Sequence, residues 1–147
     1  MIVGKVKEIW RYPVKSMAGQ RLDACTVTTH GVLGDRGWAF RDDKRGEITS
    51  ARRSPALMRF AARYREEPAP GKIPHVDITL PDGSVVGSDA ADVSARCGAV
   101  LGRSVTLWPL QPATNKAHYR RAQPGASMMA KLGHFDTFRK LLGRIAP

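Results

Sequence analysis

The segment Tyr12-Pro13-Val14-Lys15-Ser16 is the point around which this chain of 147 residues is organised. A strand-like run over residues 2–12 precedes it, and Pro13 ends that run while holding Tyr12 in an extended conformation. The break places the cation of Lys15 beside the hydroxyl of Ser16 in a loop. Positive charge and a hydroxyl donor at the end of a strand predict an anion-binding position on a β framework.

Two further basic segments follow, Gly34-Asp35-Arg36-Gly37-Trp38 and Thr49-Ser50-Ala51-Arg52-Arg53. The planar guanidinium of Arg36 can hold a phosphate through two parallel hydrogen bonds, and the glycines beside it allow the backbone to come close to a ligand. From charge alone a simpler explanation also stands. Arg36 would pair with a carboxylate and Lys15 would be solvated, and for Arg52 and Arg53 solvation is the stronger explanation.

The rest of the chain reads mainly as strands. Alternating or β-branched segments predict strands over 2–12, 22–29, 37–42, 47–51, 59–66, 75–80, 85–86 and 104–110. Tight turns with a glycine at 43–46 and 81–84 predict two hairpins, because glycine accepts the positive φ that such turns need.

Helical signals are fewer. Ser88 or Asp89 should cap a helix over about 89–101, whose apolar face comprises Val93, Cys97, Val100 and Leu101, with Gly102 after its end. Pro55–Met58 fits one helical turn capped by Ser54. The predicted fold class is therefore a β-rich α+β domain, a small β-barrel over residues 1–112. A basic tail over 113–147 follows, with an amphipathic helix as one interpretation of 128–144.

The net charge of +11 has two sources. Residues 1–67 carry 14 Lys and Arg against 8 Asp and Glu, and residues 116–147 carry 7 against 1. This excess favours an acidic partner such as phosphate, nucleic acid or an anionic membrane, without choosing among them. No apolar run is long enough to cross a bilayer and no signal peptide is visible, so a cytoplasmic location is expected. Cys25 and Cys97 are accordingly expected to be reduced and buried.

The familiar signatures of catalysis are missing. No two of the four histidines have the spacing of a metal pair, and neither cysteine belongs to a CxxC motif. The chain contains no phosphate-binding Gly-rich motif and no Gly-x-Ser-x-Gly elbow. We therefore predict no catalytic residue and no metal ligand.

Taken together, the three basic motifs resemble the N-terminal β-barrel domain of MOSC proteins. These are relatives of the molybdenum cofactor sulfurase C-terminal domain and include the mitochondrial amidoxime-reducing component. The resemblance covers residues 1 to about 110 and carries the ordered motifs at 12–16, 31–39 and 49–52. It implies that this domain and a following MOSC domain together hold the molybdenum pterin cofactor.

The resemblance also assigns roles to residues. The family's Lys and Ser of the first motif and its Arg of the second contact the pterin-phosphate part of the cofactor, and they match Lys15, Ser16 and Arg36. Arg52 matches the third motif and joins the candidate cofactor-binding residues without a defined contact. The family's molybdenum-ligating cysteine lies in the second domain, which would begin near the end of this sequence.

The leading hypothesis is a binding module, not an enzyme in isolation, that forms half of a molybdenum-cofactor site. A MOSC domain or partner chain would complete the site, and the isolated chain would not retain the cofactor tightly. One alternative is a basic nucleic-acid-binding β-barrel, although Trp10, Trp38 and Trp108 fit apolar strand positions better than a stacking platform. Another is a self-contained molybdenum-cofactor-dependent reductase. The tail would either pack on the barrel or dock on an acidic partner or membrane, and the chain should fold without the residues after about Pro124.

Overall fold

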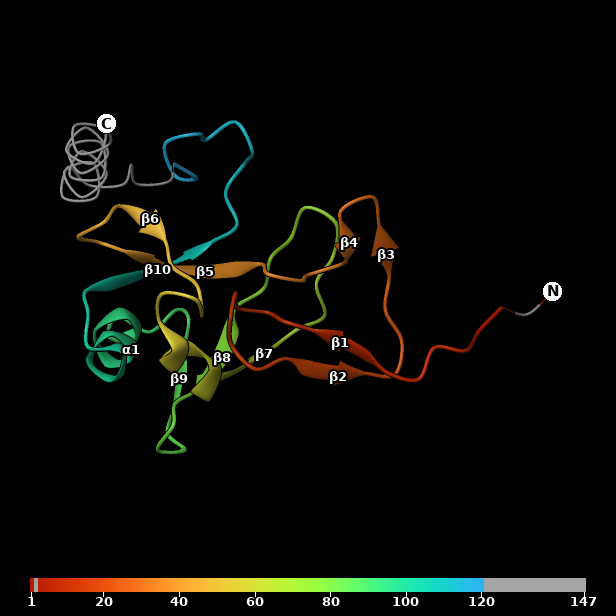
Figure 1. The fold of residues 1–147 in the computed structure, drawn as a ribbon, viewed down its shortest axis with the longest axis horizontal. Coiled ribbons are helices and arrows are strands. Elements are labelled where there is room, and N and C mark those ends of the chain that lie inside the picture. Colours follow the sequence, from red (N-terminus) through yellow and green to blue (C-terminus); the bar gives the residue numbers. More distant parts are fainter. Residues whose placement is uncertain (2, 121–147) are drawn as a thin grey trace, which may run out of the picture.

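The computed structural model describes residue 1 and residues 3–120, which contain ten short strands, one 3₁₀ helix and one α-helix (Figure 1). In chain order these are β1 (Ile9–Arg11), β2 (Gln20–Leu22), β3 (Val27–Thr28), β4 (Gly31–Val32), β5 (Trp38–Asp42), β6 (Glu47–Ile48), η1 (Pro55–Arg59), β7 (Ala61–Tyr64), β8 (Val76–Thr79), β9 (Val85–Gly87), α1 (Val93–Leu101) and β10 (Val105–Pro109). The predicted β-rich class with one firm α-helix is confirmed for this part of the chain.

The strands form four small antiparallel sheets: β1-β2, β3-β4, β10-β5-β6 and β7-β8-β9. The prediction of a small barrel needs correction here, since the ladders within the described residues do not join into one closed sheet. Single parallel bridges connect the sheets instead, between Val14 and Trp38 and between Ala18 and Ala61. Because Pro13 has no N–H to donate, the pairing at Val14 and Trp38 cannot extend into a longer ladder.

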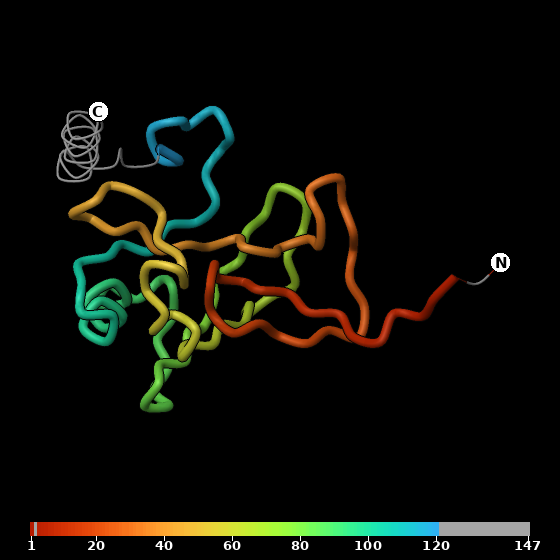
Figure 2. Tube along the Cα trace, in the orientation of Figure 1, coloured from red at the N-terminus to blue at the C-terminus, as the bar shows by residue number. Residues whose placement is uncertain are grey.

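The loop after β1 therefore runs along the seam between the two three-stranded sheets. Figure 2 shows this part of the trace turning back on itself before β2. Val14 and Met17 are buried beneath the seam, whereas Lys15 and Ser16 lie between them in the sequence and are only partly buried. The alternation anchors the loop by its apolar side chains and leaves its polar side chains at the surface.

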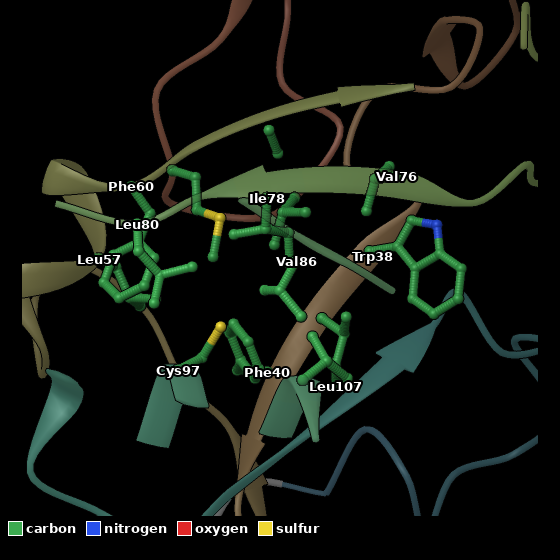
Figure 3. Close-up of a cluster of buried hydrophobic side chains, with 14 of the residues drawn as sticks. Trp38, Phe40, Leu57, Phe60, Val76, Ile78, Leu80, Val86, Cys97 and Leu107 are labelled. Carbon is green, nitrogen blue, oxygen red and sulfur yellow. The ribbon is translucent and has the colours of Figure 1, made fainter. Parts of the chain in front are cut away.

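The hydrophobic core lies between β5 and β10 on one side and β7, β8 and β9 on the other (Figure 3). Alternate residues of each strand point into it, as the period of two requires. The labelled side chains in Figure 3 are Trp38, Phe40, Leu57, Phe60, Val76, Ile78, Leu80, Val86, Cys97 and Leu107. Helix α1 packs against β10 and contributes the buried Cys97, so it closes one end of this core.

The helix begins four residues later than predicted, at Val93 with Asp92 as its N-cap. The two residues expected to cap it have other partners. The Ser88 hydroxyl accepts a hydrogen bond from the Val76 N–H at 3.0 Å, and the Asp89 carboxylate pairs with Arg65 at 2.8 Å. Gly102 ends the helix in the left-handed conformation as expected, but Val100, which was assigned to the apolar face, is exposed.

The N-terminal strands are much shorter than predicted. Of residues 3–12, which the structure describes, only β1 pairs, because its partner β2 has three residues. The single strand expected over 22–29 is divided between β2 and β3, which pair with different partners. Asp23 and Ala24, both unfavourable in strands, lie at the division.

Several elements are present where the sequence predicts them. They are the hairpins around 43–46 and 81–84, the turn at η1, and the strands β7 and β10. No helix in the described ranges is long and apolar enough to cross a membrane. The helix proposed for 128–144 and the end of the basic tail lie outside the described residues.

Candidate functional site

Backbone hydrogen bonds place the first two basic motifs side by side. The Arg36 N–H donates to the Tyr12 carbonyl at 2.7 Å, and the Trp38 N–H donates to the Pro13 carbonyl at 3.0 Å. The Lys15 N–H donates in turn to the Trp38 carbonyl at 2.9 Å. The side chains of Lys15 and Arg36 therefore emerge from adjacent backbone segments that are fixed to each other.

Two candidate residues have strained backbones. Ser16 has φ of 69° and Arg36 has φ of 54°, and they are the only residues other than glycine with positive φ among those that the structure describes. This region costs an L-amino acid roughly 1–2 kcal/mol. Such strain persists where the surrounding structure determines it, and it occurs often at ligand-binding positions.

The glycines beside Arg36 serve packing as well as conformation. The Tyr64 hydroxyl donates a hydrogen bond to the Gly34 carbonyl at 2.8 Å, and a Cβ atom added at Gly37 would overlap that hydroxyl. A Cβ atom at Gly34 would press against Pro68. The sequence suggested that these glycines admit a ligand, but here they admit Tyr64 and Pro68.

An ion pair between the buried Arg11 and the exposed Glu67 places a guanidinium over the Tyr64 ring. The Arg11 side chain is 2% exposed and forms two hydrogen bonds with Glu67, at 2.6 and 3.0 Å. Its guanidinium carbon lies 5.2 Å from the centre of the Tyr64 ring. Burial raises the pKa of Tyr64 to about 12, so its hydroxyl stays protonated and keeps donating to Gly34 at physiological pH. The hydrogen bonds from Arg11 lower the pKa of Glu67.

We call residues 33–37 the Arg36 loop. Two cavities open beside this loop, and both are lined by Lys15 and Arg36. The first, which we call the loop cavity, has a volume of about 410 Å³ and is lined by Tyr12, Lys15, Ser16, Met17, Ala18, Arg36, Ala51 and Met58. The second, the aromatic cavity, has a volume of about 470 Å³. Lys15, Arg36, Arg52, Arg53, Trp108, His118, Tyr119 and Arg120 are among its lining residues.

The charges around the aromatic cavity are mostly positive. Lys15, Arg52 and Arg120 form no ion pair with a described residue, and Arg36 has only Asp35, at 3.6 Å from its Nε. The carboxylate of Glu47 is buried in the wall, where it accepts hydrogen bonds from Arg45 and Arg53. A cavity lined by cations that lack acidic partners attracts and holds anions.

One wall of this cavity is aromatic. His118 lies edge-on to Trp108, with ring centres 5.5 Å apart, and edge-on to Tyr119 at 5.0 Å. The Tyr119 hydroxyl donates to the Gln111 carbonyl at 2.6 Å and accepts from the Gln111 N–H at 2.9 Å. Burial, followed by the neighbouring charge of Arg41, lowers the pKa of His118 and favours the neutral ring that packs here.

All four residues predicted for cofactor binding border these cavities. Lys15 and Arg36 line both, Ser16 lines the loop cavity and Arg52 lines the aromatic cavity. Their binding roles remain predictions. Arg120 is exposed and also lines the aromatic cavity.

Other lining residues were missed because an irregular segment brings them there. The Leu110 N–H donates to the Gly37 carbonyl at 2.7 Å, and the segment over 110–120 then folds back so that His118 lies against Trp108 of β10. No periodic pattern marks such a return. The prediction that all three tryptophans occupy apolar strand positions is correct for Trp38, which is buried, whereas Trp10 and Trp108 are exposed.

Within residues 1 and 3–120, no group of three His, Cys, Asp or Glu side chains could hold a metal ion. The two cysteines are both free, with Cys97 buried and Cys25 partly buried.

Comparison with known proteins gives two findings. The family model described as the MOSC N-terminal beta barrel domain matches residues 3–117. Mitochondrial amidoxime reducing component 2 from Bos taurus is 34% identical over 70 residues, which cover 44% of this chain and 20% of that protein. The matched region thus spans about a fifth of that relative's length.

Proposed function

Because the chain belongs to the MOSC N-terminal β-barrel family, we propose that it forms the anion-binding half of a molybdenum-cofactor site and holds the phosphate-bearing pterin part. The family is associated with this cofactor, and the relative's name describes an amidoxime-reducing component. The observation that carries the proposal is the meeting of both cavities at Lys15 and Arg36, on backbones that are hydrogen-bonded together.

The residues of the loop cavity fit the chemistry of a phosphate ester. Lys15 supplies a compact charge, Arg36 supplies a planar pair of donors, and the Ser16 hydroxyl supplies a neutral donor beside them. When bound, the cofactor would supply redox chemistry at molybdenum. The role of this chain would be to hold and orient the phosphate end.

A MOSC domain, in the same chain or in another, would complete the site. Exposed apolar side chains support this part of the proposal, because Tyr12 and Met58 border the loop cavity and Leu110 and Tyr119 border the aromatic cavity. An apolar rim around a charged centre is typical of a surface that another domain covers.

The expected affinity of the chain alone is modest. Charge-assisted hydrogen bonds contribute roughly 1.5–3 kcal/mol each, and association opposes binding by about 4–15 kcal/mol. Three such bonds therefore leave at most about 5 kcal/mol of net binding free energy, which corresponds to a dissociation constant no tighter than roughly 0.1 mM. The Arg36 side chain is 66% exposed, which places its contribution at the low end of that range.

Isothermal titration of the chain with hydroxymethylpterin phosphate tests the proposal. Lys15→Ala and Arg36→Ala should each weaken binding about tenfold, the effect of losing one charge-assisted bond. Lys44→Ala and Arg63→Ala remove exposed cations that line neither cavity and serve as matched controls. Equal losses in all four variants would show binding to general positive charge and would refute the assigned site.

A further inference from the structure

The aromatic cavity contains more recognition chemistry than a phosphate requires. Trp108 is 38% exposed, so part of its ring is available to a ligand, and His118 holds it from the side. Arg52 and Arg120, neither of them paired with a described acid, lie around the same space. Together the cavity offers an aromatic face and separate cations to one ligand.

We propose that the aromatic cavity binds a nucleoside phosphate, with its base stacked on Trp108 and its phosphate held by Arg52 and the shared cations Lys15 and Arg36. Flat bases stack well on tryptophan, whatever their hydrogen-bonding pattern. A volume of about 470 Å³ is within the usual range for a small-molecule site. The inference rests on the proposed function, since it uses the same shared cations.

The geometry separates this position from that of the pterin. Ser16 lines only the loop cavity, and Trp108 lines only the aromatic cavity. The two cavities meet at Lys15 and Arg36, where an anionic group would lie. A ligand filling both would carry a ring at each end and phosphate in the middle, which is the form of a dinucleotide.

The separate positions of the two exposed tryptophans also favour a mononucleotide unit over an extended nucleic acid. Trp10 is the other exposed tryptophan in the described part of the chain, and it lines neither cavity. Its indole N–H donates instead to Glu8 at 3.0 Å. The two exposed rings therefore do not share a cavity, whereas strand-binding surfaces stack successive bases on neighbouring aromatic rings.

The test compares guanosine diphosphate with inorganic pyrophosphate by isothermal titration of the full chain. Wild-type protein should bind guanosine diphosphate about tenfold more tightly, the effect expected from one stacked base. Trp108→Leu keeps an apolar side chain in β10 but removes the ring, and it should abolish the difference. Trp108→Phe should retain most of it, and Trp10→Leu is the matched control.

A second comparison separates this inference from the proposed function. Ser16→Ala should weaken the binding of hydroxymethylpterin phosphate and leave the affinity for guanosine diphosphate unchanged. Trp108→Leu should weaken the binding of guanosine diphosphate and leave the affinity for hydroxymethylpterin phosphate unchanged. If pyrophosphate binding depends on Lys15 and Arg36 but the base adds nothing, the nucleoside site is refuted and the anion site stands. If neither pyrophosphate nor the pterin ester binds, both fail. Tighter binding of oligothymidylate than of guanosine diphosphate would overturn the inference in favour of nucleic acid.

Discussion

Gly37→Ala should damage the site through Tyr64, although neither residue carries charge. A Cβ atom at position 37 would overlap the Tyr64 hydroxyl, while its next neighbours would be the Ile73 Cγ2 at 3.1 Å and the Tyr64 Cζ at 3.4 Å. Backbone strain is not the cause, since Gly37 does not have positive φ. Forcing an atom into such a packed position typically destabilises a protein by about 1–3 kcal/mol.

Removing the hydroxyl should relieve the overlap. Tyr64→Phe alone loses the hydrogen bond to the Gly34 carbonyl and should destabilise the fold by about 1–2 kcal/mol. In that background the added methyl group meets only contacts that a small shift can accommodate. The double variant should therefore be about as stable as Tyr64→Phe, with a coupling energy of roughly 1–3 kcal/mol between the two sites.

Urea unfolding followed by tryptophan fluorescence measures the four free energies of this cycle. Titration of the same proteins with pyrophosphate measures its affinity, which reports whether Arg36, the residue before Gly37, has moved. Affinity should fall in Gly37→Ala and recover in the double variant. Free energies that add to within about 0.5 kcal/mol would refute the idea that Tyr64 holds the Arg36 loop.

Two further predictions concern buried and paired groups. Burial raises the pKa of Cys97 to about 11, so Ellman's reagent should modify the partly buried Cys25 in the folded protein and Cys97 only after unfolding; equal rates for the two thiols would contradict this. Because Arg11 lowers the pKa of Glu67, the pair stabilises the fold above the unfolded-state pKa of a glutamate, and this contribution is lost as pH falls through the lower folded value. Glu67→Gln should be less stable than wild type at neutral pH and equal to it in acid, as urea unfolding at the two pH values would show; an undiminished gap in acid would exclude the ion pair as the cause.

The elements that were predictable from sequence are those decided by local chemistry. The turns at 43–46 and 81–84 contain glycines with positive φ, and β7 alternates buried and exposed side chains as its sequence does. The start of α1 was not predictable in the same way. Both Ser88 and Asp89 are good capping residues, but contacts with β8 and Arg65, distant in sequence, engage them first.

In the candidate site too, the residues fixed by local chemistry were predictable, and those placed by contacts distant in sequence were not. Charge and small residues marked Lys15, Ser16 and Arg36 because each motif is local and lies at the end of a strand. The aromatic wall depends on residues 110–120 folding back so that His118 reaches Trp108, and nothing in that segment's composition predicts this return. Similarly, the burial of Arg11 depends on Glu67 in another loop, since a lone arginine next to a strand end suggests a solvated side chain.

The strain at Ser16 and Arg36 bears on how tightly the proposed half-site would bind a phosphate by itself. The carbonyls of Tyr12, Pro13 and Trp38 accept hydrogen bonds that hold both segments in place through the protein's own backbone. A ligand therefore meets a loop that is already shaped, and no affinity is lost in ordering it. The Arg36 side chain remains largely exposed and Lys15 is only partly buried, so water and salt screen their attraction for phosphate. Covering the apolar rim with a second domain would exclude that water and strengthen the same contacts without moving them, which is how a preformed half-site becomes a tight one.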